Sequence, residues 1–179
     1  QNIIDKLRRP QFDLIGFQEC ENPELVKKSV GDKMKDFEVY YADHGIGQAW
    51  DTTKYQKVGE PIAVRYSADV WGPRLVSLVH LEHTQTKQKI LFANTHGPTG
   101  MGCASQWVQQ PCHRCDSVTD LNASHCENYG HNSTDVGKKI VSIIRDHLFE
   151  NEDLIFTGDF NMETSSGAVK EMKKTFDLA

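Results

Sequence analysis

Asp159 and Asn161 place a carboxylate and a carboxamide one residue apart, directly after a short apolar run. That run, residues 154–156, has the composition of a buried strand, and Gly158 lets the backbone turn where the strand ends. Because side chains alternate along a strand, we expect Asp159 and Asn161 to point to the same side. A carboxylate binds a cation or accepts a proton and a carboxamide holds an oxygen, so the pair suits a metal-bound phosphate. An Asx turn that closes the strand explains the same two residues equally well.

Two more apolar runs end in polar residues that could take part in the same chemistry. Residues 14–17 are followed by Gln18 and Glu19, and residues 90–93 are followed by the Asn94-Thr95-His96 triplet. Carboxylate oxygens are ligands for a hard cation such as Mg²⁺, so Glu19 and Asp159 are the candidate metal ligands. His96 could donate to a phosphate oxygen or protonate a leaving group. Taken singly, Glu19 is better explained as a solvated acid and His96 as a loop histidine.

Glu60 is a candidate for a supporting role, because it stands just before the strand expected at residues 61–66. A carboxylate in this position could accept a hydrogen bond from an imidazole and hold its tautomer. The alternative is an acid at the end of a loop.

The elements that must position these residues alternate between the two periodicities, so the sequence predicts an α/β fold. We expect strands at residues 12–17, 37–41, 62–66, 75–82 and 89–95 and in the run before Asp159, with a hairpin-like turn at 84–87. We expect the last turns of a helix over residues 2–9, ended by Pro10. We expect further helices over residues 22–34 with Asn22 as the cap, from a cap at Thr134 or Asp135 to about 148, and over 167–174. The helix that ends near 148 has one apolar stripe, formed by Val136, Ile140, Ile143, Ile144 and Leu148. Residues 42–59 are polar and carry three glycines, which predicts a long loop.

The bulk composition limits the classes of function. The chain has 179 residues, 38% hydrophobic and 25% charged, which is enough for one globular domain with a real core. No apolar stretch approaches the length of a membrane span. The net charge of −5 gives no global positive field. This argues against a structural DNA-binding module, but a nuclease can neutralise phosphate with a cation and a local patch.

Residues 97–133 form an unusual segment with few large apolar side chains. Two glycosylation sequons, at Asn122 and Asn132, accompany a cluster of cysteines, which favours an oxidising, secretory environment. Four cysteines fall in this segment: Cys103, Cys112, Cys115 and Cys126. Two disulfides with any of three pairings explain them better than a zinc knuckle, because only one clean Cys-x-x-Cys arm is present. Cys20 lies apart from the cluster, and we expect it to be a buried free thiol.

Four motifs in this order resemble those of a known superfamily. They are FQE at residues 17–19, GEPIA at 59–63, NTHGP at 94–98 and GDFN at 158–161. Together they resemble the endonuclease/exonuclease/phosphatase superfamily, which includes pancreatic-type deoxyribonuclease, apurinic endonucleases, neutral sphingomyelinases and inositol-polyphosphate 5-phosphatases. The resemblance extends from about Ile3 to the end of the chain, apart from the Cys-rich insert at about 97–133.

The resemblance implies a two-sheet α/β sandwich that cleaves phosphoesters with Mg²⁺, or alternatively Mn²⁺. Glu19 matches the metal-binding glutamate of the superfamily, and His96 matches the histidine that contacts the scissile phosphate. Asp159 and Asn161 match the pair that activates water and orients the phosphate. Glu60 matches the acid that supports the histidine.

The sequence also departs from the superfamily pattern at both ends. The first strand, with its asparagine, would precede Gln1, and the closing Asp-His pair would follow Ala179. We therefore expect residues 1–179 to be a partial domain with an incomplete site, poorly active by itself, within a gene product that is an enzyme. A signal peptide would not be visible in such a fragment.

Three interpretations follow for the function. The first is a secreted or extracellular phosphodiesterase acting on nucleic acid. The second is a lipid phosphodiesterase similar to sphingomyelinases, or a phosphatase, and the third is a non-catalytic extracellular binding module on the same fold. Sensitivity to EDTA in a phosphodiester-cleavage assay separates the third from the others, and a panel of DNA, RNA and sphingomyelin separates the first from the second.

The position of the Cys-rich insert directly after His96 predicts that it shapes substrate entry. Deleting the segment from Cys103 to Cys126 should therefore change the ratio of kcat/KM between substrates of the panel more than it changes the metal dependence. An unchanged preference would show that the insert does not select the substrate.

Overall fold

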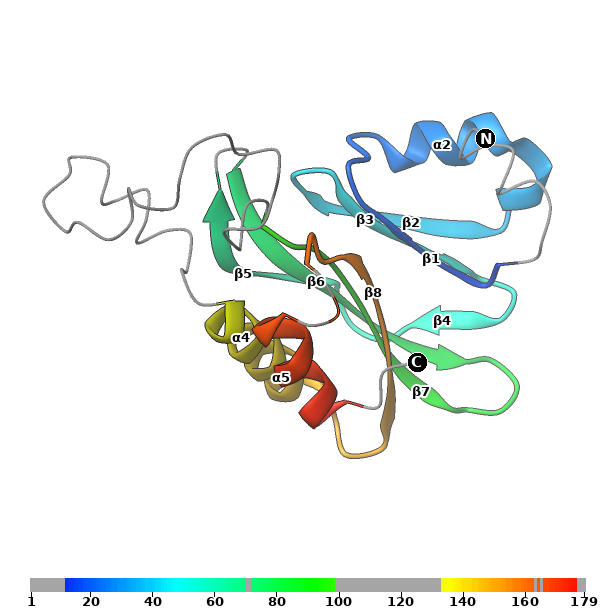
Figure 1. The fold of residues 1–179 in the computed structure, drawn as a ribbon. Coiled ribbons are helices and arrows are strands. Elements are labelled where there is room, and N and C mark those ends of the chain that lie inside the picture. Colours follow the sequence, from blue (N-terminus) through cyan, green and yellow to red (C-terminus); the bar gives the residue numbers. More distant parts are fainter. Residues whose placement is uncertain (1–11, 70–71, 99–132, 163, 165, 177–179) are drawn as a thin grey trace, which may run out of the picture. The chain divides into compact units, whose positions relative to one another are not determined.

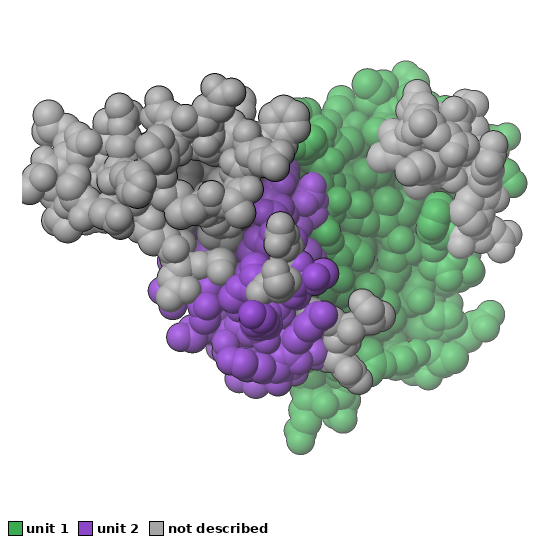
Figure 2. Space-filling view, viewed as in Figure 1, with its two compact units in different colours: residues 1–63, 77–95, 148–158 green, residues 64–76, 96–147, 159–179 purple. Residues whose placement is uncertain are grey.

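A computed structural model describes residues 12–69, 72–98, 133–162, 164 and 166–176. The pattern of contacts divides the chain into two compact units, coloured in Figure 2. Unit 1 comprises residues 1–63, 77–95 and 148–158, and unit 2 comprises residues 64–76, 96–147 and 159–179. Strands from the middle of the chain contribute residues to both units, and we describe each unit by itself.

The described residues form a mixed α/β structure (Figure 1). The strands are β1 (Leu14–Phe17), β2 (Phe37–Asp43), β3 (Ile46–Asp51), β4 (Tyr55–Lys57), β5 (Ile62–Asp69), β6 (Gly72–His83), β7 (Lys89–His96) and β8 (Glu152–Asp159). The helices are α2 (Pro23–Val30), the 3-10 helix η1 (Gly31–Met34), α4 (Ser133–His147) and α5 (Gly167–Thr175). Each strand and helix expected from the sequence within these residues is confirmed. The helix expected over 22–34 divides into α2 and η1, and Asn22 caps α2 by accepting the Leu25 N–H at 2.8 Å.

The prediction of one long loop over residues 42–59 was wrong, because this segment contains β3 and β4. Strand β3 was missed because two of its residues carry no apolar signal. Gly47 has no side chain, and Gln48 is polar but fully buried. The Gln48 amide is satisfied by long-range partners: its Nε2 donates to Phe92 O at 2.7 Å and its Oε1 accepts from Ser77 Oγ at 2.5 Å.

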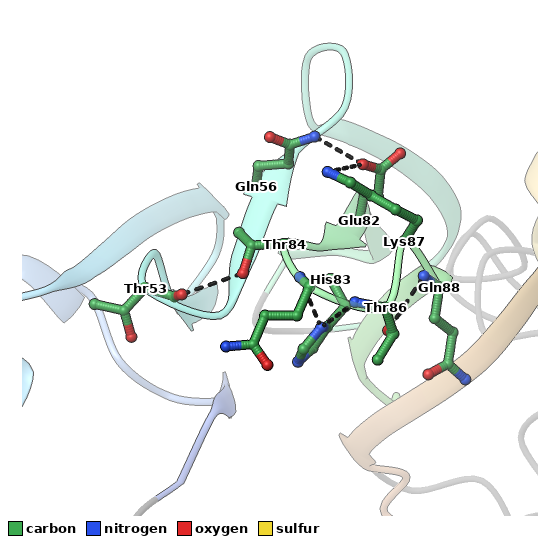
Figure 3. Close-up of polar contacts among 9 residues, drawn as sticks. Thr53, Gln56, Glu82, His83, Thr84, Thr86, Lys87 and Gln88 are labelled. Atoms are coloured by element: carbon green, nitrogen blue, oxygen red, sulfur yellow. Dashed lines mark hydrogen bonds and ion pairs between the residues drawn. The ribbon is translucent and has the colours of Figure 1, made fainter.

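Two sheets organise the strands. Three strands form an antiparallel sheet in the order β1-β3-β2, with Gly16 opposite Gln48 and Val39 opposite Ala49. Five strands form the second sheet, in the order β4-β6-β7-β8, with β5 also pairing with β6. The turn predicted at residues 84–87 is confirmed. There His83 Nδ1 accepts the backbone N–H groups of Gln85 and Thr86 at 3.3 and 3.2 Å, and Thr84 Oγ1 donates to Thr53 O at 3.3 Å (Figure 3).

The core of unit 1 has two apolar layers. Between the sheets, Trp50 of β3 packs with Val79 and Leu81 of β6 and Phe92 of β7. On the other face of the three-stranded sheet, α2 and η1 bring Val30 and Met34 against residues that include Phe17, Phe37 and Ala49. The three-stranded sheet is thus covered by apolar side chains on both faces, and burial of this apolar area stabilises the packing of the second sheet and of the helices against it. The predicted two-sheet α/β architecture is therefore confirmed.

Asn94 of β7 is a buried polar residue that joins four segments of unit 1. Its Nδ2 donates to Phe17 O and to Gly47 O, both at 2.9 Å. Its Oδ1 accepts from Thr157 Oγ1 at 3.0 Å and from Gln18 Nε2 at 2.5 Å. The carboxamide thus makes all four hydrogen bonds that its geometry allows. Gly16 lies against this group: a Cβ at Gly16 would come within 2.2 Å of Thr157 Oγ1 and 2.7 Å of Asn94 Oδ1.

A second buried polar contact holds β8 to β6 in unit 1. His80 Nδ1 lies 2.8 Å from Glu152 Oε1, with both side chains largely buried. Phe149 stacks on the His80 ring with the centroids 4.7 Å apart. Glu152 also accepts the Phe149 N–H at 3.1 Å, so the pair fixes the turn that enters β8.

Helices α4 and α5 of unit 2 lie side by side (Figure 1). The apolar stripe predicted for α4 is confirmed at Val136, Ile140 and Ile144, which are fully buried. The helix begins at Ser133, so Thr134 and Asp135 lie inside it, and the prediction that one of them is its cap was wrong. Ser166 caps α5 by accepting the Val169 N–H at 3.3 Å.

Several predictions lie outside the described residues. They concern the helix before Pro10, the four clustered cysteines and the two sequons. Disulfides, glycosylation and secretion therefore stay predictions. The assignment of residues 1–179 to one partial domain also stays a prediction. Cys20 is a free thiol, as predicted, but it is half-buried rather than buried. Among the helices that the structure describes, none is long and apolar enough to cross a membrane.

Replacing Asn94 with alanine should destabilise the protein by about 3 kcal/mol or more, because it leaves buried partners on β1, β3 and β8 without a hydrogen bond. Urea unfolding measures the change in free energy. Asn151, an exposed residue of the turn before β8, is the matched control, and Asn151→Ala should change stability by about 0.5 kcal/mol or less. Similar values for the two variants would show that Asn94 does not hold the strands.

Candidate active site

Asp159 is the last residue of β8, and an Asx turn follows it. Its Oδ1 accepts the backbone N–H of Asn161 at 2.9 Å. Asn161 has a φ of 51°, in the left-handed region that a non-glycine residue seldom adopts. The strand alternation from which we expected a common direction therefore stops at Asp159, and the Asx turn sets the position of Asn161 instead. Such backbone strain is often found at functional sites.

Gly97 joins the exit of β7 to the exit of β8 in unit 2. Asn161 Nδ2 donates to Gly97 O at 2.8 Å, and the Gly97 N–H donates to Asp159 O at 2.7 Å. A Cβ at Gly97 would lie 2.0 Å from Phe160 O. Only glycine therefore allows the two segments to approach this closely, and the approach fixes the carboxamide of Asn161.

His96 is the last residue of β7 and only 4% exposed. Its Nδ1 lies 3.0 Å from Arg74 Nη1, and Tyr66 Oη donates to its carbonyl oxygen at 3.3 Å. Arg74, near the start of β6, is only 5% exposed. Sequence reasoning missed Arg74, since an arginine near a strand end is ordinarily solvated, and only strand pairing brings it to His96.

Glu19 lies in unit 1, just beyond β1, with an exposed side chain. Its backbone is also left-handed, with a φ of 53°. The loop between β2 and β3 supports it: the Cys20 N–H donates to Gly45 O at 2.9 Å, and a Cβ at Gly45 would lie 3.1 Å from the Glu19 Cα. Burial raises the pKa of the neighbouring Cys20 thiol above its ordinary value, which favours the neutral thiol.

Glu60 lies in unit 1 and is 88% exposed. Its two carboxylate oxygens accept from Lys57 Nζ at 3.4 and 3.2 Å. The expected support of His96 by Glu60 stays a prediction, whereas the contact that the structure places at Nδ1 of His96 comes from Arg74.

The structure thus brings three of the sequence-predicted residues together within unit 2. His96, Asp159 and Asn161 are connected through the backbone of Gly97. Glu19 and Glu60 belong to unit 1. The assigned roles of all five residues stay predictions.

The oxygen atoms of Asp159 and Glu19 have the chemistry that a hard cation requires. The Asp159 carboxylate is exposed and uses Oδ1 for the Asx turn, which leaves Oδ2 available to a cation. Glu19 is exposed as well. Within the described residues, no group of three or more His, Cys, Asp or Glu side chains could hold a metal ion. Each of these carboxylates, taken by itself, has the oxygen donors that Mg²⁺ and Mn²⁺ prefer.

Comparisons with known proteins identify the fold. No protein-family model matches the sequence, and no curated protein matches it. An endonuclease/exonuclease/phosphatase family protein of Bacteroides thetaiotaomicron is 15% identical, with a TM-score of 0.63 over 96% of this chain and 57% of that chain. The mannosyl-6-phosphatase of the same species is 16% identical, with a TM-score of 0.62 over 96% and 60%. The human Nocturnin catalytic domain with bound sulfate is 13% identical, with a TM-score of 0.60 over 94% and 58%.

The chain has the fold of the endonuclease/exonuclease/phosphatase superfamily, so the resemblance expected from its four motifs is confirmed at the level of the fold. It spans about three fifths of the length of these solved structures, between 57% and 60%.

Replacing Gly97 with alanine should destabilise the protein by about 2 kcal/mol, because the added methyl group overlaps Phe160 O and separates the exits of β7 and β8. Thermal and urea unfolding measure the loss. Gly59→Ala is the control: Gly59 has a φ of 75° and nothing within 4 Å of an added Cβ, so only backbone strain of about 1 kcal/mol is expected. A smaller loss at Gly97 than at Gly59 would contradict the steric argument.

Proposed function

We propose that the protein containing this chain is a metal-dependent hydrolase of phosphoester bonds, and that its substrate is a phosphodiester. The observation that carries the proposal is the cluster in unit 2, where Gly97 ties His96 to Asp159 and Asn161. Imidazole, carboxylate and carboxamide are groups that can supply the proton transfer and charge stabilisation of phosphoryl transfer to water.

The names of the solved structures with this fold support the class of reaction. They include a mannosyl-6-phosphatase and ANGEL2, described as a 2′,3′-cyclic phosphatase. D. rerio TDP2, which is 11% identical with a TM-score of 0.54, was solved with a single-strand DNA product. The last of these favours nucleic acid over phospholipid as the substrate of this protein.

Each residue of the cluster has a defined task in the proposed reaction. Asp159 accepts a proton from the attacking water or binds the cation through the oxygen that the Asx turn leaves available. Asn161, fixed by its bond to Gly97 O, turns its carboxamide toward the phosphate oxygens. His96 donates from its ring to a phosphate oxygen. Asp159 would contribute a carboxylate oxygen to Mg²⁺ or Mn²⁺, and the ion would supply Lewis-acid stabilisation of the developing charge. The metal-binding role expected for Glu19 stays a prediction.

Asp159→Ala in the full translation product should lower kcat by roughly 100- to 10,000-fold, as loss of a general acid–base group typically does. The assay follows hydrolysis of DNA, RNA and sphingomyelin in excess Mg²⁺. Asp146→Ala, which removes an exposed carboxylate from α4, should leave kcat unchanged. Near-normal turnover of the Asp159 variant would remove this residue from the mechanism.

Chelation tests the metal requirement separately. EDTA should abolish hydrolysis by the wild-type protein, and excess Mg²⁺ or Mn²⁺ should restore it. Hydrolysis that persists in EDTA would contradict metal dependence. Cleavage of sphingomyelin but not of DNA or RNA would identify a lipid phosphodiesterase, and absence of all three activities would favour a binding module on the same fold.

A further inference from the structure

The contact between Arg74 and His96 has no counterpart in the roles expected from the sequence. Both side chains are buried, at 5% and 4% exposure, and their nitrogen atoms Nη1 and Nδ1 lie 3.0 Å apart. Both residues belong to unit 2. The contact is therefore a feature of the interior of that unit, rather than a chance meeting of two surface side chains.

The chemistry of the two groups decides which nitrogen of His96 carries the proton. A guanidinium has five N–H donors, no acceptor, and keeps its charge in proteins. The contact is a hydrogen bond only if Nδ1 accepts, which requires Nδ1 to be unprotonated. A neutral ring then carries its proton on Nε2. A doubly protonated imidazolium would instead place two cations against each other inside the protein, which is unfavourable.

Tyr66 fixes the backbone of the same residue. Its hydroxyl donates to the His96 carbonyl at 3.3 Å and is buried with it. Tyr66 thus holds the main chain of His96, and Arg74 contacts Nδ1 of its ring.

We propose that Arg74 is a positioning residue that holds His96 in its Nε2–H tautomer, so that the ring presents a donor to the phosphate. This inference rests on the proposed function of His96 for its catalytic consequence. The tautomer itself does not depend on any activity.

The wild-type protein provides the first test. Long-range ¹⁵N–¹H correlation spectra of the ¹⁵N-labelled chain distinguish the two tautomers, because Nε2 couples to both ring protons and Nδ1 mainly to one. His96→Gln identifies the His96 signals among the eight histidines of the chain. We expect a protonated Nε2 and an unprotonated Nδ1. A proton found on Nδ1 overturns the proposal without any Arg74 variant.

Two variants test the cause. Arg74→Met removes the donor and should produce a mixture of the two tautomers, whereas Arg74→Lys keeps a donor and should restore the Nε2–H form. Arg65→Met is the matched control, since Arg65 is an exposed arginine on the neighbouring strand β5, and it should leave the His96 signals unchanged. Pure Nε2–H tautomer in a folded Arg74→Met protein would overturn the proposal.

Kinetics separate positioning from direct binding of the substrate. For Arg74→Met we expect kcat to fall about 10- to 100-fold, the usual effect of losing a group that orients a catalytic side chain, with KM changed by less than about twofold. A large rise in KM with unchanged kcat would assign Arg74 to phosphate binding instead and overturn the positioning role. If the wild-type protein hydrolyses none of the phosphoesters, the proposed function fails, while the spectra still decide whether Arg74 sets the tautomer.

Discussion

The saturated carboxamide of Asn94 is the constraint on which unit 1 depends. Two carbonyls, one hydroxyl and one side-chain amide from other segments all bond to this one group. A buried carboxamide with a missing partner would cost a large part of the stability of a small domain. The positions of β1, β3 and β8 relative to β7 therefore have little freedom, and the apolar core of Trp50 and Phe92 forms around a fixed polar centre.

Two glycines allow neighbouring segments of the backbone to approach each other closely. Gly16 lets β1 reach the Asn94 carboxamide, and Gly97 lets the residues after β7 reach those after β8. These two positions serve different purposes. The first closes the core of unit 1, and the second brings the residue after His96 against Asp159 and Asn161 within unit 2. Gly97 thus follows His96 in the chain and contacts Asp159 and Asn161, the other two residues of unit 2 that we propose for chemistry.

The proposed site combines exposed and buried polar groups in a way that suits phosphoester hydrolysis. Asp159 is exposed and can meet a cation and water, whereas His96 is buried and held at its ring and at its carbonyl. A donor fixed in advance stabilises developing charge without having to reorganise during the reaction. Glu19 and Asn161 both have left-handed backbone conformations, which are energetically unfavourable for residues other than glycine and often occur at functional sites.

The sequence alone determined the elements whose signals are local: the cap at Asn22, the apolar stripe of α4, the runs of β6 and β7, and the GDFN motif that closes β8. Four short motifs in a fixed order also indicated the fold, through their resemblance to a known superfamily. The sequence did not determine β3, because Gly47 and Gln48 become strand residues only through partners on other strands. Tertiary structure alone decided that Asn161 is held by Gly97, that Glu60 pairs with Lys57, and that Arg74 meets the His96 ring. Most of these contacts join residues far apart in the chain, so their hydrogen-bond partners cannot be inferred from periodicity or spacing. The Glu60–Lys57 pair is local. Two charged side chains three residues apart, however, do not by themselves specify a bond.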